Sequence, residues 1–415
     1  MLDLKEIRRD PDAARAALER RRAGERLDEV LQLDERRREL LPQVESLRAE
    51  RNTASERIGR AKKAGEDASD AIAAMQELAP KVKALEEEVR SVDEQLGAAQ
   101  ASLPNLPLDS SPTDEEVVRE WGEAGREGRD HLELLGDGVD MEAGARLSGS
   151  RFAYLRGPVV LLEFALVRWA LELLMGEGFE PVVPPVLVRE EALYGTGFLP
   201  DTEQQIYHVP DDDLYLVGTS EVALASLHGG QVLEPGTLPR RYAGFSTCFR
   251  REAGAAGKDT RGLFRVHQFD KVEMFAFVEP DTSEEEHERI LAIEERIMQA
   301  LEIPYRVVNI AAWDLGASAA KKYDVEAWLP GQARYRELTS CSNTTDYQAR
   351  RLNARYRPED GASPRHVHTL NGTAVAVGRT IIAIVENGQR DNGTVEIPAV
   401  LHEFGAPATI EAAQP

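Results

Sequence analysis

Residues 249–275 read FRREAGAAGKDTRGLFRVHQFDKVEMF, and this stretch predicts two strands joined by a long loop. Apolar residues alternate with polar ones over residues 242–249 and again over 264–277, which is the pattern of a strand pair. Glycine and alanine dominate residues 252–262, as expected of a loop. The stretch suits a polyphosphate, because arginine carries a fixed charge and a planar fork that matches phosphate oxygens. Its cationic residues are Arg250, Arg251, Lys258, Arg261, Arg265 and Lys271. The alternative is an ordinary long hairpin that faces solvent.

The composition is that of an ordinary globular protein, with 42% apolar and 30% charged residues. The 415 residues suffice for roughly two or three domains. No amino-terminal apolar segment has the form of a secretory signal, and the longest apolar stretch, residues 159–175, is too short and too charged to span a bilayer. Cys248 and Cys341 lie far apart without a CxxC or Cys/His cluster, so we expect neither a disulfide framework nor a zinc site. These features predict a cytoplasmic protein without a membrane partner.

The first hundred residues carry two heptad patterns separated by a turn signal at residues 64–67. Apolar residues and two arginines step by three and four along the first: Val30, Leu33, Arg37, Leu40, Val44, Leu47, Arg51, Ala54 and Ile58. The second comprises Met75, Leu78, Val82, Leu85, Val89, Val92 and Leu96. Together they predict an antiparallel coiled-coil hairpin over residues 27–98, with helices about 50 Å long. Asp10-Pro11 predicts an earlier helix start, and Pro42 and Pro80 should kink the two long helices.

Charge is distributed unevenly along the chain. The formal net charge is −23, which argues against nucleic-acid binding, yet residues 36–63 hold nine basic and four acidic residues. A local basic stripe on an acidic body can still bind phosphates. Most heptad hairpins serve dimerisation, and that alternative stays open here. The stripe comprises Arg36, Arg37, Arg38, Arg48, Arg51, Arg57, Arg60, Lys62 and Lys63.

The remaining sequence predicts a second domain of mixed helix and sheet. A proline-rich break over residues 102–112 reads as a linker, and we place the domain boundary between residues 107 and 108. Residues 159–175 form a helix apolar nearly all round, with one side for the core and the other for a two-fold partner. Residues 182–188 are expected to form a strand that Pro184-Pro185 interrupts, at a sheet edge or an interface. Further strands are expected at residues 215–218, 305–310, 323–328, 335–338 and 367–377, and helices at 283–301 and 378–385. With no Rossmann fingerprint, this order predicts an α+β fold whose antiparallel sheet is flanked by helices.

Three motifs in order resemble those of class II aminoacyl-tRNA synthetases. The first is the apolar helix followed by a strand ending at Pro185. The second is Phe249-Arg250-Arg251-Glu252, with the return segment Val266-His267-Gln268-Phe269. The third is Asn371-Gly372-Thr373 leading to Gly378-Arg379-Thr380. Together with the coiled-coil arm and the run Ser340-Cys341-Ser342-Asn343, they resemble the seryl-tRNA synthetases of bacterial type over nearly the whole chain.

The resemblance implies an ATP site. Arg250 resembles the arginine at the α-phosphate, Glu252 the acceptor of the adenine amino group, and Phe269 the ring stacked under adenine. Arg379 resembles the arginine near the γ-phosphate, and Glu337 and Ser340 resemble the ligands of Mg²⁺ bound with ATP. Arg251, Leu338 and Thr339 complete the implied ATP-binding set.

The resemblance also implies a serine site and macromolecular partners. Thr219 and Glu221 would bind the ammonium group of serine, with Ser220 between them, and Glu273 and Thr373 would read its hydroxyl. The implied activity is serine–tRNA ligation in a homodimer, with serine tRNA, and also selenocysteine tRNA, bound through the basic arm.

Two other functions fit parts of the sequence. An enzyme that activates an amino acid and loads a carrier protein would not need the basic stripe at residues 36–63. A coiled-coil interaction protein would not need Arg250, Glu252, Glu337 and Arg379 together. Each of these residues taken alone also has a structural explanation, as a surface ion pair, a cap or a core side chain. His267 and Cys341 are expected to be structural.

Overall fold

The computed structural model describes residues 1–200, 205–253, 259 and 261–413. The chain forms two compact units, one of residues 2–104 and one of residues 105–415 with Met1. Residues 254–258 and 260 of the predicted loop, Lys258 among them, lie outside the described part of the chain.

The first unit is helical. It contains α1 (Leu4–Arg9), α2 (Pro11–Arg20), α3 (Arg26–Ala64) and α4 (Ser69–Ser102). The predicted helix start at Pro11 is confirmed: proline occupies the first turn, and the Asp10 carboxylate accepts a hydrogen bond from the Ala13 N–H at 3.0 Å. An aspartate before the first turn commonly accepts one of the backbone N–H groups that have no partner within the helix.

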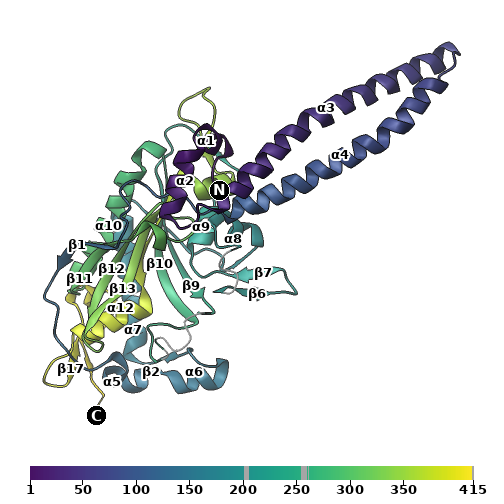
Figure 1. Cartoon of the computed structure of the whole chain (residues 1–415). Coiled ribbons are helices and arrows are strands. Elements are labelled where there is room, and N and C mark those ends of the chain that lie inside the picture. The colour runs from purple at the N-terminus through teal and green to yellow at the C-terminus, as the bar shows by residue number, and fades with distance from the viewer. Residues whose placement is uncertain (201–204, 254–258, 260, 414–415) are drawn as a thin grey trace. The chain divides into compact units, whose positions relative to one another are not determined.

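The coiled-coil hairpin is confirmed as well, with α3 and α4 side by side in Figure 1. The heptad positions are the more buried ones along both helices, and Val30, Leu40 and Val44 on α3 are 5% exposed or less. Gly65 ends α3 with φ 71°, a left-handed conformation that glycine adopts at no cost. Both helices continue through their internal prolines, and the predicted kinks stay predictions. At 1.5 Å per residue the 39 residues of α3 span about 58 Å.

The second unit is built on an eight-stranded sheet within the described residues, in the order β1-β11-β12-β13-β16-β10-β9-β4. All neighbours pair antiparallel except β4 and β9, which are parallel. The strands are β1 (Glu116–Trp121), β4 (Glu180–Val182), β9 (Arg240–Phe249), β10 (Gln268–Val278), β11 (Tyr305–Asn309), β12 (Lys321–Leu329), β13 (Arg334–Asn343) and β16 (His368–Ala376).

Three helices pack on this sheet and share its main hydrophobic core (Figure 1). They are α7 (Pro158–Gly176), α10 (Ser283–Ala300) and α12 (Val377–Asn387). The α+β architecture predicted from the sequence is therefore confirmed. Among the described residues, no helix combines the length and apolarity that crossing a membrane requires.

Shorter elements surround the sheet. The helices are α5 (His131–Leu135), α6 (Met141–Ser148), α8 (Glu190–Thr196), α9 (Glu221–Ser226) and α11 (Tyr347–Leu352). The strands are β2 (Val139–Asp140), β3 (Tyr154–Leu155), β5 (Leu187–Val188), β6 (Tyr207–Val209), β7 (Leu214–Leu216), β8 (Val232–Leu233), β14 (Arg355–Tyr356), β15 (Arg365–His366), β17 (Thr394–Glu396) and β18 (Thr409–Glu411).

The sequence misplaced several boundaries. The interrupted strand predicted at residues 182–188 is confirmed in its edge position, because β4 is the last strand of the eight-stranded sheet. Pro184-Pro185 ends the ladder there, so the residues beyond it form β5 in a different sheet. The second strand of the central pair begins at Gln268 rather than at residue 264. The edge strand β1 was not predicted, since all six of its residues are exposed and give no inward alternation.

Candidate active site

Neighbouring strands of the sheet bring a carboxylate, a hydroxyl and an ammonium group together. Glu273 on β10 lies directly opposite Thr373 on β16, and the Thr373 hydroxyl donates to Glu273 Oε2 at 3.1 Å. Side chains two apart on a strand share a face, so Lys271 projects on the same side, and its Nζ lies 2.5 Å from Glu273 Oε2. Both Lys271 and Glu273 are nearly inaccessible to solvent. Because they pair with each other, neither buried charge is left uncompensated.

A second buried carboxylate, Glu221, begins α9. Gln348 Nε2 and Asn371 Nδ2 both donate to its Oε1, at 2.8 and 2.9 Å. Burial, reinforced by the negative charge of Glu273, raises the pKa of Glu221 to about 7. The Thr219 hydroxyl accepts the N–H of Glu221 at 3.2 Å. The buried Glu221 carboxyl is therefore suited to binding a cationic ligand, because such a ligand would stabilise its ionised form.

Two arginines face the cavity from different elements. Arg250, directly after β9, donates through Nε to the Gly218 carbonyl at 3.1 Å, and its guanidinium lies 5.3 Å from the centre of the Phe269 ring. Arg379, on the first turn of α12, donates through Nη1 to the Glu337 carbonyl at 2.9 Å. Burial lowers the pKa of Arg379, yet the guanidinium stays cationic because the intrinsic pKa of arginine is so high.

Glu337 on β13 stays ionised in cationic surroundings. Burial alone would raise the pKa of its carboxyl, but the positive charges of Lys322, Arg379 and Arg250 outweigh that effect and lower it. The nearest cation, Arg379 Nη1, lies 3.4 Å from Glu337 Oε2. On β12, Lys322 pairs with Asp324 at 2.7 Å, and burial raises the pKa of Asp324 to about 7. An ionised Glu337 on the cavity wall offers oxygen atoms of the kind that a hard cation such as Mg²⁺ binds.

Glu252 follows the two arginines after β9. Its carboxylate accepts a hydrogen bond from Arg265 Nη1 at 2.6 Å, and its backbone adopts a left-handed φ of 50°. His267 is not within a strand but immediately before β10. Its Nδ1 lies 2.8 Å from the Arg250 carbonyl, and its own carbonyl accepts the Arg250 N–H at 3.0 Å. These contacts fix the backbone of Arg250, consistent with the structural role expected of His267.

Most of these groups line one cavity of about 390 Å³, and Gln348, Asp324 and His267 are not part of its lining. Of the residues predicted for ATP and serine, it brings together Thr219, Glu221, Arg250, Glu252, Phe269, Glu273, Glu337, Leu338, Thr339, Ser340, Thr373 and Arg379. Two predicted residues are not among the lining. Arg251 is exposed and lies over the Tyr207 ring at 5.8 Å, and Ser220 is fully buried beside the Gly244 carbonyl. Cys341 is fully buried too, and burial raises the pKa of its thiol, as suits a packing residue.

Sequence reasoning missed several lining residues. Asn371 lies two positions from the predicted Thr373 on the same strand, so the alternation of side chains predicts that it shares the cavity face. The same alternation places Lys271 beside Glu273, whereas the sequence analysis names Lys271 only among the cations expected near phosphate. Lys322 lines the cavity from β12, where polar residues alternate with apolar ones; this alternation predicts a shared face but was not used to place Lys322. Phe264 and Arg265 reach the cavity from outside the strands, so the alternation does not place them; Arg265 is predicted near phosphate only as one of the cations of residues 249–275. Among the described residues, no group of three or more His, Cys, Asp or Glu side chains is arranged to hold a metal ion.

The basic stripe of residues 36–63 lies on α3 of the arm. Three of them pair with acids of α4: Arg36–Glu88 at 2.5 Å, Arg37–Asp93 at 2.5 Å and Arg48–Glu86 at 2.7 Å. Two pair within α3: Arg38–Asp34 at 3.2 Å and Arg60–Glu56 at 3.3 Å. No ion pair is found within residues 2–104, all of them described, for Arg51, Arg57, Lys62 and Lys63. The last three lie in the outermost turns of the helix.

Two family models match the chain. The class II tRNA synthetase core domain (G, H, P, S and T) matches residues 206–388, and the seryl-tRNA synthetase N-terminal domain matches residues 1–107. The antiparallel sheet, the cavity and these matches define a class II aminoacyl-tRNA synthetase.

Full-length relatives narrow the class. A serine–tRNA ligase of Nocardia farcinica is 49% identical, with 97% of this chain and 98% of the relative covered. The crystal structure of a Pyrococcus horikoshii seryl-tRNA synthetase complexed with ATP is 42% identical, with a TM-score of 0.92 and all of both chains covered. A Naegleria fowleri serine–tRNA ligase in complex with AMP is 30% identical, with a TM-score of 0.86 and 98% and 97% covered. This chain belongs to the seryl-tRNA synthetase (serine–tRNA ligase) family.

Proposed function

We propose that this chain activates L-serine with ATP and transfers the serine to the 3′ end of serine tRNA. One observation carries the proposal: a single cavity joins the buried carboxylates Glu221 and Glu273 to the cations Arg250 and Arg379. The first pair suits a small polar amino acid, and the second suits a nucleoside triphosphate. Membership of the serine–tRNA ligase family supports the same activity.

Activation needs charge neutralisation more than acid–base chemistry. A serine carboxylate oxygen bonds to the α-phosphorus, the bond from that phosphorus to the bridging oxygen breaks, and pyrophosphate leaves. Both reactants are anionic, so Arg250 and Arg379 bind and orient them and offset the charge that develops. In the second step a ribose hydroxyl of the tRNA attacks the seryl carbonyl, and AMP leaves.

The proposed ATP contacts follow the cavity wall. Glu252 accepts from the adenine amino group, and Phe269 stacks on the base, while Leu338 and Thr339 form the adjoining wall. Glu337 and Ser340 would hold Mg²⁺. When bound, the ion would supply positive charge that neutralises the phosphate oxygens of ATP. An ionised Glu337 fits that task, because its surroundings hold its pKa low. Contact of Arg251 with ATP stays a prediction, since its side chain lies outside the lining.

The proposed serine contacts are polar and buried. Thr219 and Glu221 bind the ammonium group, with Ser220 supporting the segment between them. Glu273 and Thr373 bind the hydroxyl, and this pair favours serine over alanine, because alanine has no hydroxyl to hydrogen-bond with them. Since Glu273 and Thr373 already bond each other at 3.1 Å, the hydroxyl would enter a preorganised pair.

The proposal extends to partners and organisation. Residues 1–107 would bind serine tRNA, and also selenocysteine tRNA, through the basic arm, while residues 108–415 would form the catalytic domain. The apolar residues that α7 exposes, Leu161 (55%), Phe164 (65%) and Met175 (57%), support a homodimer formed across that helix. A cytoplasmic location fits the two unpaired buried cysteines.

ATP–pyrophosphate exchange with each amino acid in turn, without tRNA, tests the activity. We expect exchange with serine alone, followed by serine-dependent charging when serine tRNA is added. Exchange driven by alanine or glycine would instead favour loading of a carrier protein. No exchange with any amino acid, with or without tRNA, would refute the proposed activation.

A further inference from the structure

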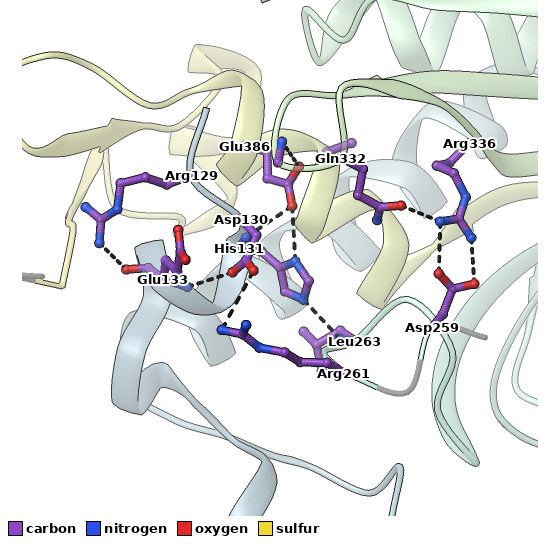
Figure 2. Close-up of polar contacts among 12 residues, drawn as sticks. Arg129, Asp130, His131, Glu133, Asp259, Arg261, Leu263, Gln332, Arg336 and Glu386 are labelled. Carbon is purple, nitrogen blue, oxygen red and sulfur yellow. Dashed lines mark hydrogen bonds and ion pairs between the residues drawn. The ribbon is translucent and has the colours of Figure 1, made fainter. Parts of the chain in front are cut away.

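A buried histidine and a buried glutamate lie next to the cavity wall without lining the cavity. His131 begins α5 and is 5% exposed, and Glu386, near the end of α12, is fully buried. His131 Nδ1 lies 3.1 Å from Glu386 Oε1, and the His131 backbone N–H donates to the same oxygen at 3.1 Å (Figure 2). The other oxygen, Oε2, accepts the Gly331 N–H at 2.9 Å. Glu386 therefore ties α5 to the β12–β13 turn.

The contacts of the ring define its tautomer. The Leu263 backbone N–H donates to His131 Nε2 at 3.1 Å, so Nε2 carries no proton. The ring proton is on Nδ1, which donates it to Glu386. Gly262 permits this close approach, because a Cβ at that position would lie only 2.3 Å from Nε2. The imidazole thus links α12 to the backbone at Leu263 (Figure 2).

The backbone that His131 holds is part of the nucleotide end of the cavity. Phe264 follows Leu263, and its carbonyl accepts Arg379 Nε at 3.2 Å. Two guanidinium groups lie over the Phe264 ring, that of Arg379 at 4.6 Å and that of Arg336 at 3.7 Å from the ring centre. Leu263, Phe264 and Arg379 all line the cavity. A shift of the peptide at Leu263 would therefore move the carbonyl and the ring that orient Arg379.

Arg336 attaches a second point of the same loop. Its guanidinium forms two hydrogen bonds to the Asp259 carboxylate, at 2.9 and 2.7 Å (Figure 2). A weaker contact joins Arg261 to Asp130 at 3.8 Å, with Arg261 mostly exposed. Of these attachments, the bond from Leu263 to His131 is the buried one that is adjacent in sequence to Phe264. Loss of the His131 bond should therefore displace Phe264, and with it Arg379, more than loss of the other attachments.

We infer that His131 is a positioning residue for the nucleotide: through Leu263 and Phe264 it sets the orientation of Arg379 toward the phosphates of ATP. This inference rests on the proposed function and deepens it. It differs from a role in core packing alone, which would affect stability and both substrates together.

Two substitutions separate the bonds of the imidazole. In His131→Asn the amide can still donate to Glu386 near the place of Nδ1, but no acceptor reaches Leu263. In His131→Gln the side-chain oxygen reaches the place of Nε2 and can still accept from Leu263, while the donor to Glu386 is lost. The bond from the backbone of residue 131 to Glu386 remains in both. Glu133→Gln, an exposed change on the same helix, is the matched control.

Steady-state ATP–pyrophosphate exchange provides the main readout. We expect His131→Asn to raise the KM for ATP about tenfold, the cost of one buried hydrogen bond, and to leave the KM for serine within about twofold. His131→Gln and Glu133→Gln should keep a KM for ATP near that of the unchanged protein. Equal losses in His131→Asn and His131→Gln, or equal changes in both KM values, would overturn the inference.

Hydrogen exchange of peptides that contain Leu263 gives a readout independent of activity. The Leu263 amide should exchange faster in His131→Asn and stay protected in His131→Gln. If His131→Asn does not fold, His131→Gln still decides: a protected amide together with a tenfold higher KM for ATP would refute the link. Absence of serine-dependent ATP–pyrophosphate exchange in the protein without substitutions would instead refute the proposed function, whatever the hydrogen-exchange rate of the Leu263 amide.

Discussion

The arm and the active-site cavity use the same kind of ion pair, but water reaches the two very differently. On the arm, Arg37 and Asp93 lie 2.5 Å apart, with side chains 38% and 44% exposed. In the cavity, Lys271 and Glu273 lie at the same distance and are 7% and 2% exposed. Exposed pairs contribute little because water and salt screen them, whereas breaking a buried pair leaves a charge without solvent. Function should therefore be concentrated in single residues of the cavity and spread over many residues of the arm.

The largest effect should come from removing a cation of the cavity. Arg250→Ala should lower kcat/KM for ATP–pyrophosphate exchange by about a thousandfold, because it removes the guanidinium that lies 5.3 Å from the Phe269 ring in the cavity. Arg251→Ala, next to it in sequence but outside the cavity, should cost less than about threefold. Exchange kinetics with serine measure both. Near-normal exchange in Arg250→Ala would show that the cavity does not depend on single charges.

Glu221 allows the contrast to be tested by pH. Its pKa of about 7 means that the carboxyl is protonated below pH 7 and ionised above it. The ammonium of serine needs the ionised form, so the KM for serine should rise about tenfold per pH unit as the pH falls below 7. Glu221→Gln should raise that KM about a hundredfold at pH 8 and abolish its pH dependence.

The KM for ATP serves as the internal control in the same titration, since ATP does not contact Glu221 in the proposed site. A serine KM that stays flat from pH 6 to pH 8 in the unchanged protein would contradict the assignment of Glu221 to the ammonium group.

How far the sequence led also differs between the two regions. The heptads of the arm and the alternation along the central strands were predictable, because each depends on neighbours within one element. Glu273 and Thr373, a hundred positions apart, were assigned through a resemblance, since only the register of β10 on β16 brings them together. His131 had no local signal at all: its contacts, Leu263 and Glu386, lie 132 and 255 positions away.

Pairing across the arm could not be read from the sequence either. The sequence predicts one basic stripe over residues 36–63, yet α4 supplies acids opposite Arg36, Arg37 and Arg48. Which acids face them depends on how the two helices align, and the heptads alone leave that alignment open. The arm thus has an inner part with compensated charge and an outer part where Arg57, Lys62 and Lys63 remain for another partner.

The outer cations should contribute moderate tRNA affinity. Replacing Arg57, Lys62 and Lys63 together with alanine should weaken serine tRNA binding about tenfold near physiological salt and reduce the salt slope by up to about three. Binding measured over a range of salt concentrations tests this, and exchange without tRNA is the control, since it should not change. Replacing Arg36, Arg37 and Arg48 instead should weaken binding less, because α4 already compensates those charges. Unchanged charging of tRNA after deletion of residues 28–96 would remove the arm from the function altogether.

The smallest effect is expected where the comparison began. A double-mutant cycle of Arg37→Ala and Asp93→Ala should give a coupling free energy of about 0.2–1 kcal/mol, because both side chains are largely hydrated before and after they pair. Native-state hydrogen exchange of the α3 amides measures it without unfolding the rest of the chain. The coupling should shrink further at high salt, where exposed charges are screened. A coupling of several kcal/mol that survives high salt would mean that the arm holds its charges as tightly as the cavity does, and that exposure does not separate the two regions.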